Sequence, residues 1–243
     1  MSDEKIEAVK LEVQRLLDAK VIREVKYSTW IANTVPVKKQ NRKWRLCIDF
    51  TDLNKACPKD DFPLLRIDKT IDAAAGSELL SLLDCFSGYH QIYMRKEDEE
   101  KTSFITPFGG YCFVRMPEGL KNAGPTFCRM TSEAFRKQIG RNLATYVDDI
   151  IVTTRKKEDH IADLDETFVN LRSSRLKLNP EKCIFRIKRG KVLGCLVSQK
   201  GIEANPDKSK AILDREQRKS KNDIQKLTGR IAALNRFISK SAE

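Results

Sequence analysis

Two adjacent aspartates, Asp148 and Asp149, stand between two strongly β-forming apolar stretches within residues 143–153. Two strands that meet at such a turn hold the carboxylates side by side, where they repel each other and lose hydration unless a cation compensates them. The same dipeptide is also a common turn sequence, because aspartate hydrogen-bonds readily to nearby backbone groups. The pair by itself is therefore compatible with a plain turn or with a cation site.

A third aspartate, Asp84, ends the continuous apolar stretch of residues 79–83, which is a costly place for a charge without a partner. If the strand that ends at Asp84 lies beside the 143–153 hairpin, three carboxylates converge. Hard oxygen ligands without histidine or thiolate suit Mg²⁺ or Mn²⁺. Such a cluster can hold two ions about 4 Å apart, one activating a 3′-hydroxyl group and the other stabilising a pyrophosphate leaving group.

The elements that must position these acids follow from the spacing of apolar residues. Helical spacing predicts helices over 4–19, 67–75, 123–138, 161–171 and from residue 220 onward. Short apolar runs between turn residues predict strands over 31–37, 44–50, 78–84, 104–105, 111–116, 143–153, 183–187 and 191–197, the last two joined at Arg189-Gly190. We therefore expect an α+β protein with mainly antiparallel strands.

Positive charge is unevenly distributed along the chain. The 243 residues contain 46 lysines and arginines against 34 acids, a net charge of +12, and residues 181–243 alone hold 16 basic and 7 acidic residues. A second basic group, with no acid among it, consists of Lys38, Lys39, Arg42, Lys43 and Arg45. Segregated positive charge favours a polyanionic partner, because each neutralised phosphate releases counterions. A solvated, lysine-rich surface is the alternative.

Composition also argues against several classes of protein. No apolar run approaches the roughly 20 residues that cross a bilayer, and the N-terminal MSDEKIEAVK is too charged for a signal peptide. The seven cysteines are scattered without a C-x-x-C pair, and only two histidines accompany them, which argues against a zinc site. We expect an intracellular protein with no membrane contact, either in a cytoplasmic particle or in the nucleus.

A series of short motifs runs in order along nearly the whole chain. It comprises WRLCIDF (44–50), LNK (53–55), FP (62–63), RID (66–68), DCFSGYHQ (84–91), KTSF (101–104), MPEGLKNA (116–123), YVDD (146–149), LNPEKC (178–183), LG (193–194) and GIE (201–203). In this order and spacing the series resembles the reverse transcriptase of gypsy-type long-terminal-repeat retrotransposons. The resemblance implies a right-hand polymerase fold, whose palm carries the catalytic acids on an antiparallel sheet.

The resemblance also implies roles for individual residues near the acids. Asp84, Asp148 and Asp149 would be the catalytic acids, and they would bind two Mg²⁺ ions, or Mn²⁺, together with the backbone carbonyl of Cys85. The reaction would be the transfer of a nucleotide from a deoxynucleoside triphosphate to a primer 3′-hydroxyl group. The partners implied are an RNA or DNA template with its primer and the triphosphate substrates.

Four further residues would surround the incoming nucleotide. Arg45 matches the arginine that holds the triphosphate, and its bidentate fork suits that task. Lys39 would make a second phosphate contact, and Glu118 would lie beside the nucleotide pocket. Tyr89 matches the aromatic steric gate that excludes a ribose 2′-hydroxyl group. A core tyrosine is the alternative if the motif is set aside.

The template–primer side is represented by a second group. Leu193, Gly194 and Cys195 fall where the family grips the primer strand, and a glycine lets backbone and phosphate approach closely. Gly119, in the MPEGLKNA motif, belongs to the same template–primer group.

The resemblance predicts three parts: an N-terminal helix with fingers (1–77), a palm with a fingers insertion near 95–125 (78–198), and the connection to and start of a thumb (199–243). The ribonuclease H, integrase and protease regions of the family have no counterpart in these residues. We expect those other polyprotein domains as partners.

The chain departs from the family pattern at several positions. Glu118 stands where phenylalanine is usual, Val192 and Cys195 where aromatic residues are common, and Pro125 where alanine is common. The basic run Arg215–Lys221 replaces a proline-containing segment. A carboxylate at Glu118 should repel a triphosphate.

These departures keep two alternatives to an active polymerase open. The first is a catalytically inert, degenerate copy that binds only nucleic acid or proteins. The second is another metal-dependent phosphotransfer enzyme with an Asp-Asp turn, which would leave Arg45, Tyr89 and the basic C-terminal quarter without a shared explanation.

Overall fold

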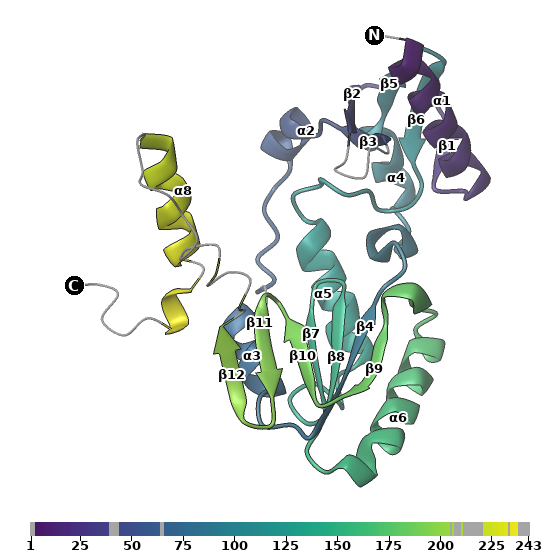
Figure 1. Cartoon of the computed structure of the whole chain (residues 1–243). Helices are drawn as coiled ribbons and strands as arrows, with labels where there is room; N and C mark the ends of the chain where they lie inside the picture. Colours follow the sequence, from purple (N-terminus) through teal and green to yellow (C-terminus); the bar gives the residue numbers. More distant parts are fainter. Residues whose placement is uncertain are drawn as a thin grey trace. The chain divides into compact units, whose positions relative to one another are not determined.

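The computed structural model (Figure 1) describes residues 3–38, 44–63, 66–204, 206, 210, 221–232 and 234–237. The chain divides into two compact units that it visits alternately. The first unit comprises Met1–Leu64, Cys85–Glu133 and Arg175–Lys177, and the second comprises Leu65–Asp84, Ala134–Ser174 and Leu178–Glu243. The three-part division into 1–77, 78–198 and 199–243 stays a prediction.

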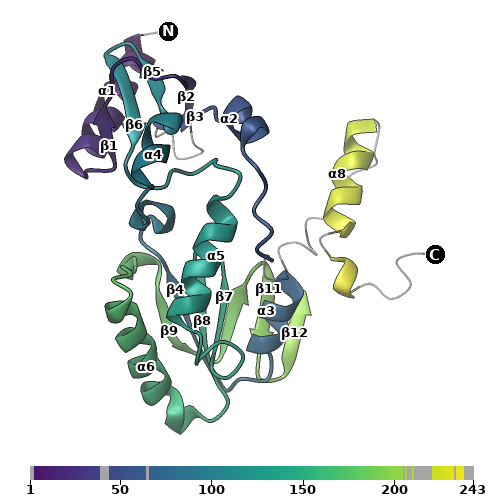
Figure 2. The ribbon, with the colours of Figure 1, turned by 180° about the vertical axis from the view of Figure 1, so that it is seen from behind.

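The second unit is built on a four-stranded antiparallel sheet. Its strands, in spatial order, are β7 (Leu143–Tyr146), β8 (Asp149–Thr154), β4 (Leu79–Asp84) and β9 (Ile184–Ile187). The central strands β4 and β8 are almost wholly buried, which explains their nearly continuous apolar sequences. Helices α3 (Ile67–Ala74) and α6 (His160–Ser173) pack on this sheet, as Figures 1 and 2 show.

A smaller antiparallel sheet in the same unit contains β10 (Arg189–Val192), β11 (Cys195–Ser198) and β12 (Gly201–Ala204). The sequence suggested one strand over 191–197, but a turn at Leu193-Gly194 splits it into β10 and β11. Both turn residues have positive φ, +46° and +87°, as a type I′ hairpin turn requires. Val192 and Val197 join Ile71 of α3 and Leu80 of β4 in one core.

The predicted pairing of 183–187 with the following strand is also wrong, because β9 pairs with β4 and β10 pairs with β11. Only Lys188 separates β9 from β10. Gly190 allows the close approach that this short connection demands, since a Cβ atom there would lie 2.7 Å from Ile187 Cδ1. In place of the expected hairpin, β9 and β10 follow each other in two different sheets and pack closely at Gly190.

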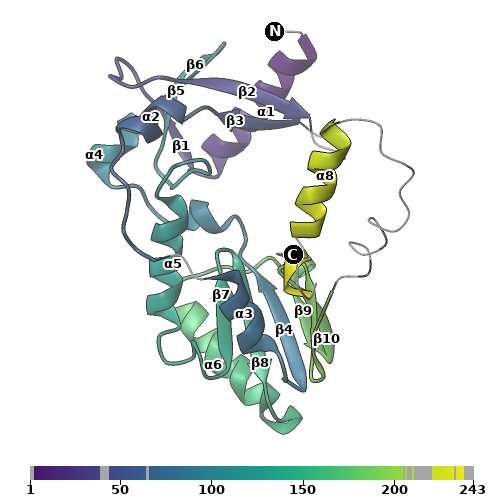
Figure 3. The same ribbon diagram turned by 90° about the vertical axis from the view of Figure 1, so that its left-hand side faces the viewer.

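The first unit contains a five-stranded sheet. In spatial order its strands are β1 (Ile22–Glu24), β6 (Gly109–Phe113), β5 (Phe104–Thr106), β2 (Ala32–Lys38) and β3 (Trp44–Ile48). Helix α1 (Asp3–Asp18) packs on this sheet (Figure 3), and its buried Val9, Val13 and Leu16 meet Phe104 and Phe113. The strands predicted over 31–37 and 44–50 pair antiparallel as β2 and β3, and those predicted over 104–105 and 111–116 pair antiparallel as β5 and β6.

Short helical segments connect these sheets. They are α2 (Thr51–Ala56), η1 (Gly88–Gln91), α4 (Lys96–Glu99), η2 (Glu100–Thr102), α5 (Ala123–Ala134), η3 (Lys157–Asp159), η4 (Pro180–Lys182), α8 (Lys221–Ala232) and η5 (Asn235–Phe237). Helix α5 ends earlier than the predicted residue 138, and α2, at six residues, is too short to show a helical period. Within the residues described, no helix has the length and apolar character needed to span a membrane.

Candidate active site

The hairpin β7–β8 carries the Asp-Asp pair at its tight turn. Tyr146 and Asp149 are paired in the ladder, so Val147 and Asp148 form the two-residue loop. Val147 has a φ of +50°, which is a strained conformation for a β-branched residue. The buried strands on either side hold the backbone in this conformation, and such stored strain is typical of functional turns.

Pairing of β4 with β8 brings two of the three predicted acids together. The ladder runs from Leu79↔Thr154 to Asp84↔Asp149, so Asp84 lies directly opposite Asp149. Opposed residues of an antiparallel pair have Cα atoms about 4.5–5.5 Å apart and side chains on the same face. Asp148 precedes Asp149 in the adjoining turn and is half-buried.

The two opposed carboxylates influence each other's charge. The pKa of Asp149 is raised above its usual range, first by burial and then by the negative charge of Asp84, while Lys182 opposes the rise. Both carboxylates can ionise comfortably only if positive charge is supplied. The binding of metal ions by Asp84, Asp148 and Asp149 stays a prediction.

Lys182 supplies part of that charge. Its Nζ atom lies 3.3 Å and 3.5 Å from the two carboxylate oxygens of Asp84. The segment that carries Lys182 is fastened to the end of β4: the Asn179 N–H donates to the Asp84 carbonyl oxygen at 2.9 Å, and the Asp84 N–H donates to Cys183 Sγ at 3.5 Å. The strand end and the lysine are therefore positioned together.

Lys182 was not singled out from the sequence, although it stands inside the LNPEKC motif. The one sequence feature that could have indicated its role is a lysine in a turn that begins at Pro180, inside a motif shared with the family. Nothing in the spacing indicates that this turn closes onto a strand end almost a hundred residues earlier.

The oxygen donors at this strand end decide whether a metal ion would fit. In the described ranges, no group of three or more His, Cys, Asp or Glu side chains is placed so that it could hold a metal ion, so these residues form no cage of protein ligands. Mg²⁺ does not need such a cage, because it is usually bound by one or two carboxylates, substrate phosphates and water. The opposed oxygen donors of Asp84 and Asp149 fit that mode of binding.

The first unit holds the residues expected around the nucleotide. Arg45 lies on β3 opposite Val37 of β2, and its guanidinium group forms an ion pair with Glu118. Cys85 follows Asp84 directly and is buried, at 4% exposure. Lys39 lies outside the described residues, as do positions 211–220, which hold most of the basic run 215–221.

Tyr89 lies in η1, after Ser87 with its φ of +46°. Its half-buried ring packs edge-on against Phe127, with ring centroids 5.6 Å apart and an interplanar angle of 71°. The aromatic contact fixes the plane of the tyrosine ring. Its role as a steric gate stays a prediction.

The predicted primer-grip residues form the β10–β11 turn and its exit. Leu193 and Cys195 pack against the core that contains Val192, so their side chains are partly buried. Gly119, in the first unit, has a φ of +95°, which favours glycine. The roles of Leu193, Gly194, Cys195 and Gly119 toward a nucleic acid stay predictions.

Solved structures with this architecture define the class of fold. A foamy viral protease-reverse transcriptase in complex with double-stranded DNA matches with a TM-score of 0.87 and 19% identity, over 96% of this chain and 41% of that chain. The foamy viral enzyme in complex with an RNA/DNA hybrid matches with a TM-score of 0.86 and 18% identity, over 96% and 31%. The fold is therefore that of a right-hand polymerase, as predicted.

Residues 37–222 match the family described as reverse transcriptase (RNA-dependent DNA polymerase), and the chain belongs to this family. Two relatives from Drosophila melanogaster support the gypsy-type resemblance. The Retrovirus-related Pol polyprotein from transposon opus is 32% identical over 239 residues, which are 97% of this chain and 24% of the relative. The polyprotein from transposon gypsy is 35% identical over 207 residues, or 83% and 20%. The chain thus spans about a quarter of these relatives or less.

Proposed function

We propose that this chain is an RNA-directed DNA polymerase domain, which transfers nucleotides from deoxynucleoside triphosphates to a primer 3′-hydroxyl group. The observation that carries the proposal is the opposition of Asp84 and Asp149 across β4 and β8, in a member of the reverse transcriptase family. The polyprotein relatives support a role as one domain among several, with ribonuclease H and integrase regions as its expected companions.

Asp84, Asp148 and Asp149, with the Cys85 carbonyl oxygen, would hold two Mg²⁺ ions, or Mn²⁺. When bound, such ions favour deprotonation of the 3′-hydroxyl group and neutralise the leaving pyrophosphate. The contribution of the protein itself is preorganisation, since two paired strands hold the carboxylates in place before substrate arrives. Lys182 offsets the charge of Asp84 in the absence of other cations.

The remaining residues would bind and select substrate. Arg45 would hold the triphosphate with its fork of donors, assisted by Lys39, and Tyr89 would exclude a ribose 2′-hydroxyl group. A template–primer duplex is the proposed polymer substrate, supported by the net charge of +12 and by the nucleic acids bound in the foamy viral structures. Leu193, Gly194, Cys195 and Gly119 would contact that duplex.

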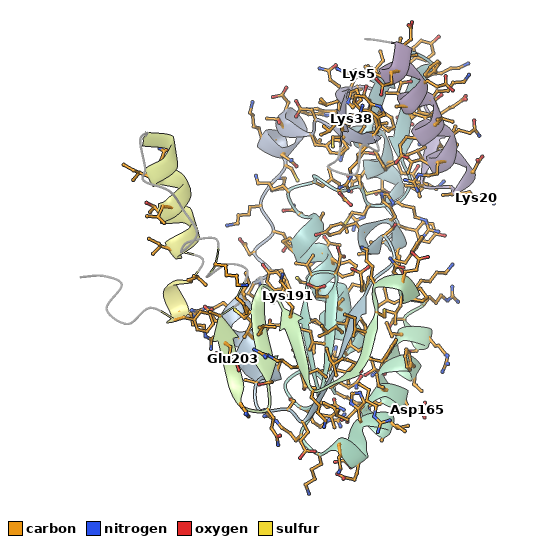
Figure 4. All side chains as sticks on the ribbon, viewed as in Figure 1. Lys5, Lys20, Lys38, Asp165, Lys191 and Glu203 are labelled. Atoms are coloured by element: carbon orange, nitrogen blue, oxygen red, sulfur yellow. The ribbon has the colours of Figure 1, made fainter. Side chains whose placement is uncertain are left out.

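The test is primer extension on an RNA template with Mg²⁺ or Mn²⁺. The Asp148→Asn, Asp149→Asn double variant should lose at least about 10³-fold in rate, because neutral amides neither bind the ions nor balance their charge. Asp165→Asn, an exposed aspartate on α6 (Figure 4), is the matched control and should extend normally. Undiminished extension by the double variant would refute the proposed site.

One observation favours a second candidate function, a catalytically inert domain that binds nucleic acid. The guanidinium group of Arg45 is ion-paired with Glu118 rather than open to a phosphate. An inert domain would bind duplexes in a salt-sensitive way without incorporating nucleotides, even with Glu118→Phe. Metal-dependent incorporation by the unaltered chain would exclude this candidate.

A further inference from the structure

We propose that Glu118 is a built-in competitor for Arg45, which the incoming nucleoside triphosphate must displace before it can bind. The inference rests on the proposed function, because it assumes that Arg45 is a phosphate ligand. What it adds is that an ion pair inside the first unit lowers the affinity of Arg45 for the triphosphate. Nucleotide binding would therefore be an exchange of one anion for another on a single guanidinium group.

The arginine side of the pair is held by the sheet. Arg45 pairs with Val37 near one end of the β2–β3 ladder, between the pairs Pro36↔Leu46 and Lys38↔Trp44. Leu46, next to it, packs on the core of the first unit. Pairing with β2 holds the backbone of this edge strand, so the guanidinium group of Arg45 moves mainly through its side-chain torsions.

The glutamate side is held by an amide clamp. Asn54 Nδ2 donates to the Gly119 carbonyl oxygen at 2.8 Å, and Asn54 Oδ1 accepts from the Lys121 N–H at 2.7 Å. Lys121 Nζ returns to the backbone of the same helix and loop, donating to the carbonyl oxygens of Asn54 at 3.1 Å and Cys57 at 2.8 Å. These hydrogen bonds tie the loop that bears Glu118 to α2. They hold the backbone of the loop where the Glu118 carboxylate pairs with Arg45.

Neighbouring charges do not take the place of this pair. Glu12 is engaged by Arg15, at 2.7 Å and 2.9 Å. Burial holds the pKa of His90 below its usual value, in spite of the opposing effect of Glu118. His90 is therefore neutral at pH 7 and adds no positive charge that could compensate the glutamate. Among the residues that the structure describes, Arg45 is therefore the cation that pairs with Glu118.

The pair is weak enough to open. The side chains of Arg45 and Glu118 are 42% and 58% exposed, and solvated ion pairs of this kind stabilise by no more than about five-fold in an equilibrium constant. A triphosphate brings several charges and a matching bidentate geometry, so it can displace one carboxylate. The competition should therefore weaken nucleotide binding without abolishing it.

The experiment compares Glu118→Gln with the unaltered chain. Glutamine keeps the size of the side chain and removes the charge, so the KM for the triphosphate should fall about two- to five-fold, with kcat changed less than about two-fold. Equilibrium dialysis with labelled triphosphate should show the same gain in affinity. The matched control is Glu203→Gln (Figure 4), which opens the similarly exposed Arg189–Glu203 pair in the second unit and should alter neither quantity.

A double-variant cycle with Arg45→Gln separates competition from plain repulsion. If Glu118 acts by occupying Arg45, the gain from Glu118→Gln should vanish in the Arg45→Gln background. A gain of equal size in both backgrounds, or no gain in the first, would overturn the inference. The two assays distinguish the two proposals. Loss of primer extension in every variant counts against the polymerase proposal. The triphosphate affinity measured by dialysis still decides the role of Glu118.

Discussion

The two regions that hold the predicted active-site residues are built in opposite ways. In the second unit, Asp84 and Asp149 are strand residues whose opposition is fixed by the β4–β8 register. In the first unit, Arg45 and Glu118 meet only through exposed side chains. A register inside a buried sheet cannot change unless the strands unpair, whereas an exposed ion pair exchanges partners at little cost.

The difference corresponds to what each end of the proposed reaction requires. Carboxylates that serve as ligands must already be in place, because rearranging them during the reaction would raise the barrier. A group that captures and releases a substrate at every cycle must be able to move. The stability of the protein should therefore depend strongly on the sheet of the second unit and weakly on the charges of the first.

A buried hydrogen-bond chain ties the acid-bearing strands of the second unit to α6. The Arg186 N–H donates to Ser81 Oγ at 3.1 Å, and Ser81 Oγ lies 2.9 Å from His160 Nε2. On the other side of the ring, Nδ1 lies 2.8 Å from Thr154 Oγ1, which donates to Asp163 Oδ2 at 2.7 Å. This direction of donation assigns the proton to Nδ1 of a neutral imidazole, with Nε2 accepting from Ser81.

The largest effect that tests the comparison is expected from His160→Ala. The substitution leaves a cavity and removes a partner from each of two buried hydroxyl groups, on β4 and on β8. It should lower the free energy of unfolding by about 3 kcal/mol, measured by urea denaturation. His90→Ala in the first unit is the matched control, with an expected loss of about 1 kcal/mol because that ring is only half-buried. Equal losses for the two variants would contradict the contrast between the regions.

A smaller effect is expected from pH, through the only two histidines of the chain. Burial lowers the pKa of both His160 and His90. Their contribution to stability is therefore complete above the unfolded pKa of about 6.5 and is lost as the pH falls through the folded values. Protonated His160 would also point a second N–H at Ser81, which could no longer donate to the ring.

The measurement is the urea concentration at which half of the protein is unfolded, determined at several pH values from 7.5 to 5. The decline toward acid should be shallower in His160→Gln than in the unaltered chain, with His90→Gln reporting the share of the first unit. Asp149 works in the opposite sense, since its raised pKa makes stability increase as that carboxyl group takes up a proton. A midpoint that rises from pH 7.5 to pH 5 would contradict the assignment to the histidines.

Much of the second unit could be predicted from the sequence, because buried strands have nearly continuous apolar sequences. The run LLSLLD ends a buried strand at Asp84, and two apolar runs flank the turn at Asp148. Once these runs are known to pair, the alternation of side chains leaves few registers that bury them. The opposition of Asp84 and Asp149 follows from that restriction.

Other features had no such signal. The turn at Leu193-Gly194 places a leucine at positive φ, which no propensity would suggest. The contacts of Lys182 with Asp84 and of Arg45 with Glu118 join side chains that are far apart in the chain and at least partly exposed, where hydropathy carries no information. Sequence reasoning reached Glu118 only as a departure from the family, and its partner became visible with the structure.

The smallest expected effect is the difference in the free energy of unfolding between the Lys182→Gln and Glu118→Gln variants, and it tests the comparison of the two regions most directly. Lys182 is 65% exposed but faces Asp84, which is 24% exposed and lies opposite Asp149. Removing its charge leaves two carboxylates opposed without compensation and should lower the free energy of unfolding by about 0.5 kcal/mol at pH 7. Glu118→Gln opens a pair exposed on both sides and should change it by less than about 0.3 kcal/mol.

The pH dependence of that difference identifies its cause. Without Lys182 the pKa of Asp149 loses the influence that lowers it, so the repulsion should fade as the pH falls and Asp149 takes up a proton. The loss caused by Lys182→Gln should therefore be present at pH 7 and disappear toward pH 4, in parallel urea titrations of both variants. If the loss is the same at both pH values, Lys182 acts through packing of its side chain, and the acids of the second unit need no resident cation.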